Sequence, residues 1–136
     1  MFDIGHLFSE QSLDNFLRGV GARGRIAVPA IDRTSVERTQ ITVRYRAGVR
    51  QGQVVSAAAA IVRFRGDPAV FFVRPERPYR RVPLGSIVGN RLIVVIYRDA
   101  PVAVEVDAAL LGEIERVERW LTRIEDEIRA AGSKVA

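Results

Sequence analysis

The chain has 136 residues and a hydrophobic fraction of 48%, which suits one globular domain that buries its own core and excludes a disordered chain. No apolar run reaches the roughly 20 residues of a bilayer-spanning helix, no signal-peptide pattern opens the chain, and no cysteine is present, so we expect a cytoplasmic protein without disulfides. The net charge is +5, and Lys134 is the only lysine among 21 basic residues, so arginine, the better partner for planar anions, dominates.

The first predicted element is a short helix over residues 9–18, ended by Gly19 or Gly21. Residues 19–24 match G-x-G-x-x-G by letters, but a dinucleotide fingerprint requires a strand before the glycines and a helix after them. Here the predicted order is reversed, which favours a helix end followed by an Arg/Gly loop. A strand is expected to start at residues 26–28, and Pro29 places it at a sheet edge.

Residues 41–46 form the clearest predicted strand. Ile41, Val43 and Tyr45 share one face, and the opposite face carries arginines, among them Arg44 and Arg46. Residues 53–63 are ambiguous: the apolar positions fit a helical stripe and four alanines favour helix, whereas a strand would break the alternation. We interpret this segment as a helix.

A short strand is predicted over residues 69–73, followed by a stiff arginine-rich loop over 74–83. Residues 92–97 and 102–106 then resemble a hairpin turned at residues 99–101. The last predicted element is a helix over residues 108–131, capped by Asp107 and followed by Gly132.

The apolar residues of this last helix follow a heptad spacing. A parallel homodimer would set glutamate against glutamate beside this seam, so the helix is also compatible with packing on a sheet or in a larger bundle. We nevertheless expect a homo-oligomer, because a small body covers so long a seam poorly. The expected oligomer contacts are Leu110, Ile114, Val117, Leu121, Ile124 and Ile128.

Charge divides the chain into a basic α+β body, 1–106, and a C-terminal helix, 107–136. The body holds 16 arginines against nine acidic residues, whereas residues 107–131 hold four arginines against seven. Aromatic residues in the body are repeatedly flanked by arginine, a pattern suited to phosphates beside unstacked bases. Strand alternation alone gives the same pattern when one face is buried, so Tyr45 and Phe64 have an equally good structural interpretation.

No catalytic or metal-binding pattern is present. His6 is the sole histidine, and no serine or carboxylate pair is placed by sequence for nucleophilic or acid–base chemistry. We expect a protein that is not an enzyme and needs no cofactor. The predicted nucleic-acid contacts are Arg74, Arg77, Arg80 and Arg81 first, then Arg44 and Arg46, then Arg63, Arg65 and Arg98, with Tyr79 and Tyr97 to stack on bases.

An arginine-rich, cysteine-free α+β body followed by an apolar heptad helix resembles the archaeal ThermoDBP-related proteins. The resemblance covers the architecture of the whole chain, without a motif matched residue by residue. It implies single-stranded nucleic-acid binding in a basic-rimmed apolar cleft, with Arg44, Arg46 and the 74–83 loop on the rim, and oligomerisation through the terminal helix.

These observations predict an α+β fold: a mostly antiparallel sheet, helices packed on one face, and a long amphipathic C-terminal helix. The predicted function is binding of single-stranded RNA or DNA with little sequence specificity. The alternative is a protein-interaction or assembly module, whose basic face meets an acidic partner or its own acidic helix.

Overall fold

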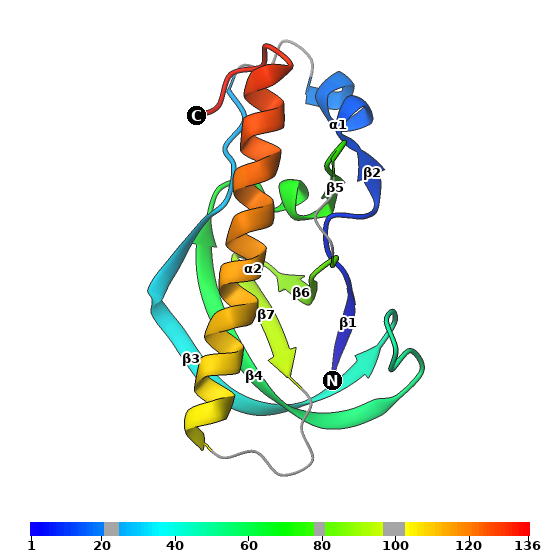
Figure 1. Ribbon diagram of the computed structural model, residues 1–136, viewed down its shortest axis with the longest axis vertical. Helices are drawn as coiled ribbons and strands as arrows, with labels where there is room; N and C mark the ends of the chain where they lie inside the picture. The colour runs from blue at the N-terminus through cyan, green and yellow to red at the C-terminus, as the bar shows by residue number, and fades with distance from the viewer. Residues whose placement is uncertain (21–24, 78–80, 97–102) are drawn as a thin grey trace.

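The computed structural model describes residues 1–20, 25–77, 81–96 and 103–136 (Figure 1). The expected α+β class is confirmed, with a mostly antiparallel five-stranded sheet and a long C-terminal helix. The elements are β1 (Phe2–His6), β2 (Gln11–Ser12), α1 (Leu13–Val20), β3 (Ala30–Tyr45), β4 (Val54–Arg65), a 3-10 helix (Pro68–Phe72), β5 (Val73–Arg74), β6 (Leu84–Val88), β7 (Arg91–Ile96) and α2 (Ala103–Ala130).

Five strands close into a small barrel in the order β1–β3–β4–β7–β6, with β6 returning to β1. Within the barrel, only the β1–β3 pair is parallel. Two long hairpin arms, β3 and β4, form most of the sheet, and a β-bulge between Asp32 and Glu37 bends β3. The β6–β7 hairpin turns through Gly89 and Asn90, and Gly89 has the positive φ that such a tight turn requires. Strands β2 and β5 form a separate two-stranded sheet.

The interpretation of residues 53–63 as a helix is wrong, because they belong to strand β4. In the middle of this strand, at residues 57–60, both faces are buried. Ala57 lies in a small core inside the barrel with Ile4 and Val43, whereas Ala58 and Ala60 belong to the larger core that includes α2. Burial on both faces removes the polar alternation by which a strand is recognised, and small side chains let both layers approach closely.

Three further predicted strands are corrected. Residues 68–72 form a 3-10 helix, which Asp67 caps by accepting a hydrogen bond from the Ala69 amide. Strand β7 pairs with β6 instead of with residues 102–106, and α2 already begins at Ala103. The segment at residues 26–28 contributes a single bridge, between Ile26 and Val135. Residues 21–24, which complete the G-x-G-x-x-G match, and the predicted turn at 99–101 lie outside the described residues.

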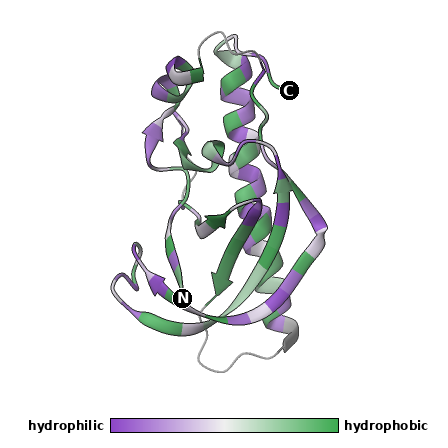
Figure 2. Cartoon of the chain, turned by 180° about the vertical axis from the view of Figure 1, so that it is seen from behind, coloured by the Kyte–Doolittle hydropathy of each residue, from purple (hydrophilic) through white to green (hydrophobic). Residues whose placement is uncertain are grey.

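Helix α2 lies along the barrel and shares its main hydrophobic core (Figure 1). In Figure 2, β7 is hydrophobic along most of its length, while α2 alternates between hydrophobic and hydrophilic residues. Trp120 is central to the packing: it is 2% exposed, and its ring stacks on Phe8 with centroids 5.5 Å apart. Phe8 in turn contacts Phe71, so α2 is joined to the turn after β1 and to the 3-10 helix.

The heptad seam is part of this core, which corrects its interpretation as an oligomer contact. Each of its six side chains is at most 3% exposed within the single chain, so none is available to a second copy in this fold. The seam is covered by the sheet, the 3-10 helix and the turn after β1. An apolar helix stripe can be buried against a sheet as well as against another helix. The corrected residues are Leu110, Ile114, Val117, Leu121, Ile124 and Ile128.

Within the described residues, no helix is both long enough and apolar enough to cross a bilayer.

Candidate functional site

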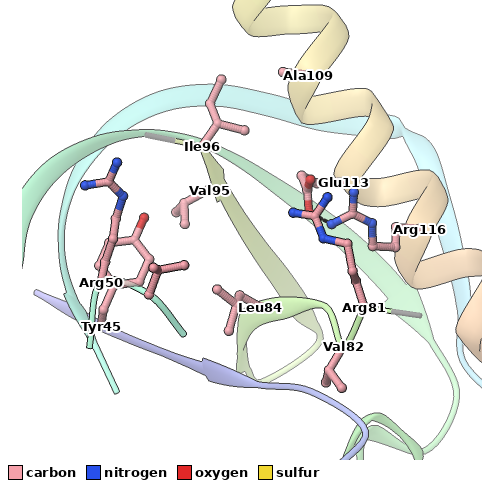
Figure 3. Close-up of a pocket in the computed structure, with 11 residues that line it drawn as sticks. Tyr45, Arg50, Arg81, Val82, Leu84, Val95, Ile96, Ala109, Glu113 and Arg116 are labelled. Carbon is pink, nitrogen blue, oxygen red and sulfur yellow. Dashed lines mark hydrogen bonds and ion pairs between the residues drawn. The ribbon is translucent and has the colours of Figure 1, made fainter. Parts of the chain in front are cut away.

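A cleft of about 370 Å³ opens where the end of the barrel meets the first half of α2 (Figure 3). Its walls come from the end of β3 with the turn after it, from residues 81–84, from the end of β7, and from one face of α2 around Ala109. The cleft therefore lies at a junction of four segments that are far apart in the sequence. Its volume falls in the range of small-ligand sites, roughly 300–1,000 Å³.

The floor of the cleft is aliphatic. Leu84, Val95 and Ile96 are each half-buried, as is Val82 beside them. Tyr45 stands on the opposite wall with its side chain anchored in the barrel core, where the residue is only 5% exposed. These residues give the cleft an apolar surface that is partly open to solvent, which is what the flat face of an aromatic ligand requires.

Three arginines surround this floor. Figure 3 shows Arg81 and Arg116 on one side of the cleft with Glu113, and Arg50 on the other side beside Tyr45. Arg116 is held in place by Glu113, with 3.3 Å between its Nη1 and the carboxylate Oε2. Arg50 donates to the Gln53 side chain at 3.4 Å.

Arg81 differs from its neighbours on the rim. Its residue is exposed, and within the part of the chain that the structure describes no carboxylate lies within ion-pairing distance of it. One acidic residue and three arginines leave the rim with a formal charge of +2. The arrangement can accept an anionic group while an attached apolar ring contacts the floor.

Of the predicted contact residues that the structure describes, only Arg81 lines this cleft. Arg44 and Arg46 instead lie on the outer side of the barrel, next to β1: Arg44 is opposite Asp3 in the strand register, and Arg46 forms an ion pair with Asp3 at 3.3 Å. They therefore do not line this cleft, and their predicted part in nucleic-acid binding stays a prediction. The reason for their position is the strand alternation itself, which turns Tyr45 inward and its two neighbours outward.

The other described arginines of the prediction occupy two further places. Arg63 and Arg65 are exposed near the end of β4, on the sheet face turned away from α2. Arg74 ends β5, and Arg77 follows three residues later beside the C-terminal half of α2, where the Glu127 carboxylate accepts hydrogen bonds from the amides of Glu76 and Arg77. The predicted arginines that the structure describes thus do not converge on one surface.

The aromatic contacts fare differently. Tyr79 and Tyr97, with Arg80 and Arg98, lie outside the described residues. Phe64 is 4% exposed and packs edge-on against Phe71, with the ring centroids 4.8 Å apart. Its ring is therefore part of the core, as the alternation of the strand alone would give. Tyr45 is likewise a core residue, although it also borders the cleft.

Sequence reasoning missed Arg50 and Arg116. Arg50 sits in the turn between β3 and β4, flanked by Gly48 and Gly52, which both have positive φ. Arg116 is on the helix that is acidic overall. Neither residue carries a local signal, since only the packing of α2 against the barrel end brings them to the same cleft.

Part of the charge segregation is used within the chain. Arg33 donates to Glu118 of α2, with 2.9 Å between Nε and Oε1, and Arg38 pairs with Asp107 at 3.0 Å. The acidic edge of α2 therefore faces the basic strand β3. Such exposed pairs contribute little stability, about 0.2–1 kcal/mol each, but they orient α2 along the strand.

Among the described residues, no group of three or more histidine, aspartate or glutamate side chains is placed to hold a metal ion. Comparison with protein-family models, with curated proteins and with solved structures finds no match to this chain. The resemblance to ThermoDBP-related proteins therefore stays a prediction, and the cleft is interpreted from its own geometry.

Proposed function

We propose that this chain binds single-stranded nucleic acid, RNA or DNA, in the cleft between the barrel end and α2, with little sequence specificity. The observation that carries the proposal is the combination of an aliphatic floor with arginines on both sides of it. An unstacked nucleotide has the matching chemistry, because it joins a flat apolar ring to an anionic phosphate.

The phosphate contacts belong to the rim. Arg81 is exposed and Arg50 faces it across the floor, so a backbone crossing the cleft meets a guanidinium group on either side. Arginine binds phosphate through two parallel hydrogen bonds, which fixes the direction of the backbone as well as neutralising its charge.

The base contacts belong to the floor. Leu84, Val95 and Ile96 present carbon atoms, which contact the face of any base without reading its hydrogen-bonding edge. This accounts for the low sequence specificity that we propose. Single-stranded rather than duplex nucleic acid is favoured, because the faces of paired bases are already covered by stacking.

Substitution of Arg81 tests this proposal. Arg81→Ala is expected to weaken binding of a fluorescein-labelled oligonucleotide, measured by anisotropy across a salt series, and to lower the slope of log affinity against log salt by about 0.7. Arg18→Ala is the matched control, since Arg18 is also exposed but lies on α1, at the other end of the molecule (Figure 1). Equal affinities and slopes for the two variants would remove the cleft from the binding surface.

The assembly-module alternative predicts a different result from the same protein. No oligonucleotide would bind, and size-exclusion chromatography would show a self-associated form that dissociates as salt is raised. The internal contacts of Arg33 and Arg38 with α2 argue against this use of the charges, because they already occupy Glu118 and Asp107.

A further inference from the structure

Three arginines come together on the sheet, at a place remote from the cleft. Strand register sets Arg63 of β4 directly opposite Arg91 of β7. On its other side, Arg63 is opposite Asp32 of β3, and Arg65 follows two residues further along β4. Residues opposite one another in a sheet share a face, so Arg63 and Arg91 project on the same side.

That side of the sheet faces away from α2. The alternate residues of the same strands, Val62 and Phe64 of β4 and Leu92 of β7, belong to the core that α2 covers. All three arginines are exposed, as is Asp32. We call Arg63, Arg65 and Arg91 the sheet arginines.

The sheet arginines have little neutralising charge around them. Within the described part of the chain, none of the three lies within 4.0 Å of a carboxylate. Asp32 is the nearest acid by register, but its Oδ1 already accepts hydrogen bonds from the amide and the hydroxyl of Thr34, at 3.0 and 2.5 Å. The pKa of Asp32 is lowered by these bonds first and then by the charges of Arg65 and Arg63.

Two like charges directly opposite one another on neighbouring strands destabilise a sheet. The register nevertheless fixes this pair, because it is the last of six consecutive pairs between β4 and β7, and a shift of one residue would take Val62 and Leu92 out of the core. An anion seated between Arg63 and Arg91 would relieve the repulsion and take bidentate hydrogen bonds from both.

We propose that the sheet arginines are a second phosphate-binding surface. They hold the sugar–phosphate backbone of the same nucleic-acid molecule that places a base in the cleft. This inference rests on the proposed function. Arg91 and the cleft residue Ile96 are the two ends of β7, about 17 Å apart at the usual rise of a strand. A nucleic-acid molecule must therefore be several nucleotides long to reach both surfaces. One that reaches both binds more tightly, because the two sites hold the same molecule.

Oligonucleotides of two lengths, about 4 and about 16 nucleotides, separate the two surfaces. The longer one should bind the unchanged protein at least tenfold more tightly. The double variant R63Q/R91Q should lose that gain and lower the salt slope for the long oligonucleotide by about 1.4, two contacts at about 0.7 each, while its affinity for the short one is unchanged. Arg81→Ala should weaken both lengths.

Two controls keep the result specific. R18Q/R25Q makes the same change in net charge at exposed positions that belong to neither surface, and should retain the length dependence. R63K/R91K keeps the charge, so it should preserve the salt slope while losing part of the affinity that bidentate contacts supply. A raised melting temperature of R91Q without nucleic acid would show independently that Arg63 and Arg91 repel each other.

The outcomes are distinct for the two proposals. Equal affinity for both lengths, or the same behaviour in R63Q/R91Q and R18Q/R25Q, overturns the second surface and leaves the cleft standing. If neither oligonucleotide binds the unchanged protein, both the cleft and the second surface are overturned. A length-dependent gain that is lost only in R63Q/R91Q supports the inference.

Discussion

At the scale of single residues, Gly66 shows how closely separate segments approach in this fold. Its φ is +115°, a conformation that side chains with a Cβ rarely adopt, and a Cβ placed there would lie 2.8 Å from the Pro29 Cα. The approach is held by the Asp67 amide, which donates to the Ala27 carbonyl oxygen at 2.7 Å. Gly66 thus serves two purposes: it turns the chain at the end of β4 and lets the segment before β3 pass close by.

Comparison with Gly52 separates these two contributions. Gly52 also has a positive φ, +90°, but a Cβ there would meet nothing within 4 Å. Gly52→Ala should lower the free energy of unfolding by about 1–2 kcal/mol through backbone strain alone. Gly66→Ala should cost clearly more, because backbone atoms must also move apart. Urea denaturation measures the free energy of unfolding of both variants. Equal decreases would mean that the segment at Pro29 moves away from residue 66 without cost.

The hydroxyl of Thr34 gives a second prediction at this scale. The lowered pKa of Asp32 means that this carboxylate stabilises the fold above its ordinary pKa of 3.8, and that the contribution is lost as pH falls through the folded value. Thr34→Val removes the hydroxyl donor, so the pKa of Asp32 should rise toward 3.8. An NMR titration of the Asp32 carboxyl carbon checks the direction, with Thr39→Val as a control on the same strand. An unchanged pKa would show that the backbone amide alone sustains the shift.

At the scale of elements, α2 illustrates what an apolar heptad does and does not specify. The spacing correctly predicts a long helix with a buried stripe, yet the stripe is covered by the chain's own sheet instead of by a second copy. The periodicity of a sequence indicates that one side of a helix is buried, but it does not indicate whether a sheet or a second helix covers that side. Among the α2 residues from Glu105 onward, whose exposure is described, Leu111 is the one exposed large apolar residue, at 44%.

Ile124 and Leu111 are the pair that tests this assignment. Ile124→Ala should lower the free energy of unfolding by about 2–5 kcal/mol, as for other buried truncations, and Leu111→Ala by much less. Denaturation should be independent of protein concentration in both variants. If the seam were an oligomer contact, Ile124→Ala would instead shift the sedimentation of the protein and leave the fold of each chain intact.

The other elements show where sequence reasoning succeeded and where it stopped. The strand at residues 41–45 and the α+β class could be predicted, because alternation and the C-terminal helix signals are local. Strand β4 could not, because burial on both faces made Ala57–Ala60 resemble a helix. For the cleft, Arg81 was found from the local excess of arginine, whereas Arg50 and Arg116 are brought together only by tertiary packing.

At the scale of the whole molecule, the body and the C-terminal helix are one structure. The division at residue 107 follows charge, but the hydrophobic core does not respect it: Ile114 and Trp120 of α2 share one cluster with Val62 of β4 and Phe8 of the turn after β1. The acidic helix edge is also paired with β3 through Arg33 and Arg38. Neither part can therefore lose its structure without exposing the apolar surface of the other.

A shared core predicts that the chain unfolds in one cooperative step. Trp120 is the only tryptophan, and its stacking on Phe8 makes its fluorescence a reporter of the contact between α2 and the body. Far-UV circular dichroism reports the strands and helices of the entire chain. In urea, the two signals should give the same midpoint and the same free energy of unfolding. A fluorescence transition at lower urea than the dichroism transition would mean that α2 detaches first, and the two parts would then be separate units as their charges suggest.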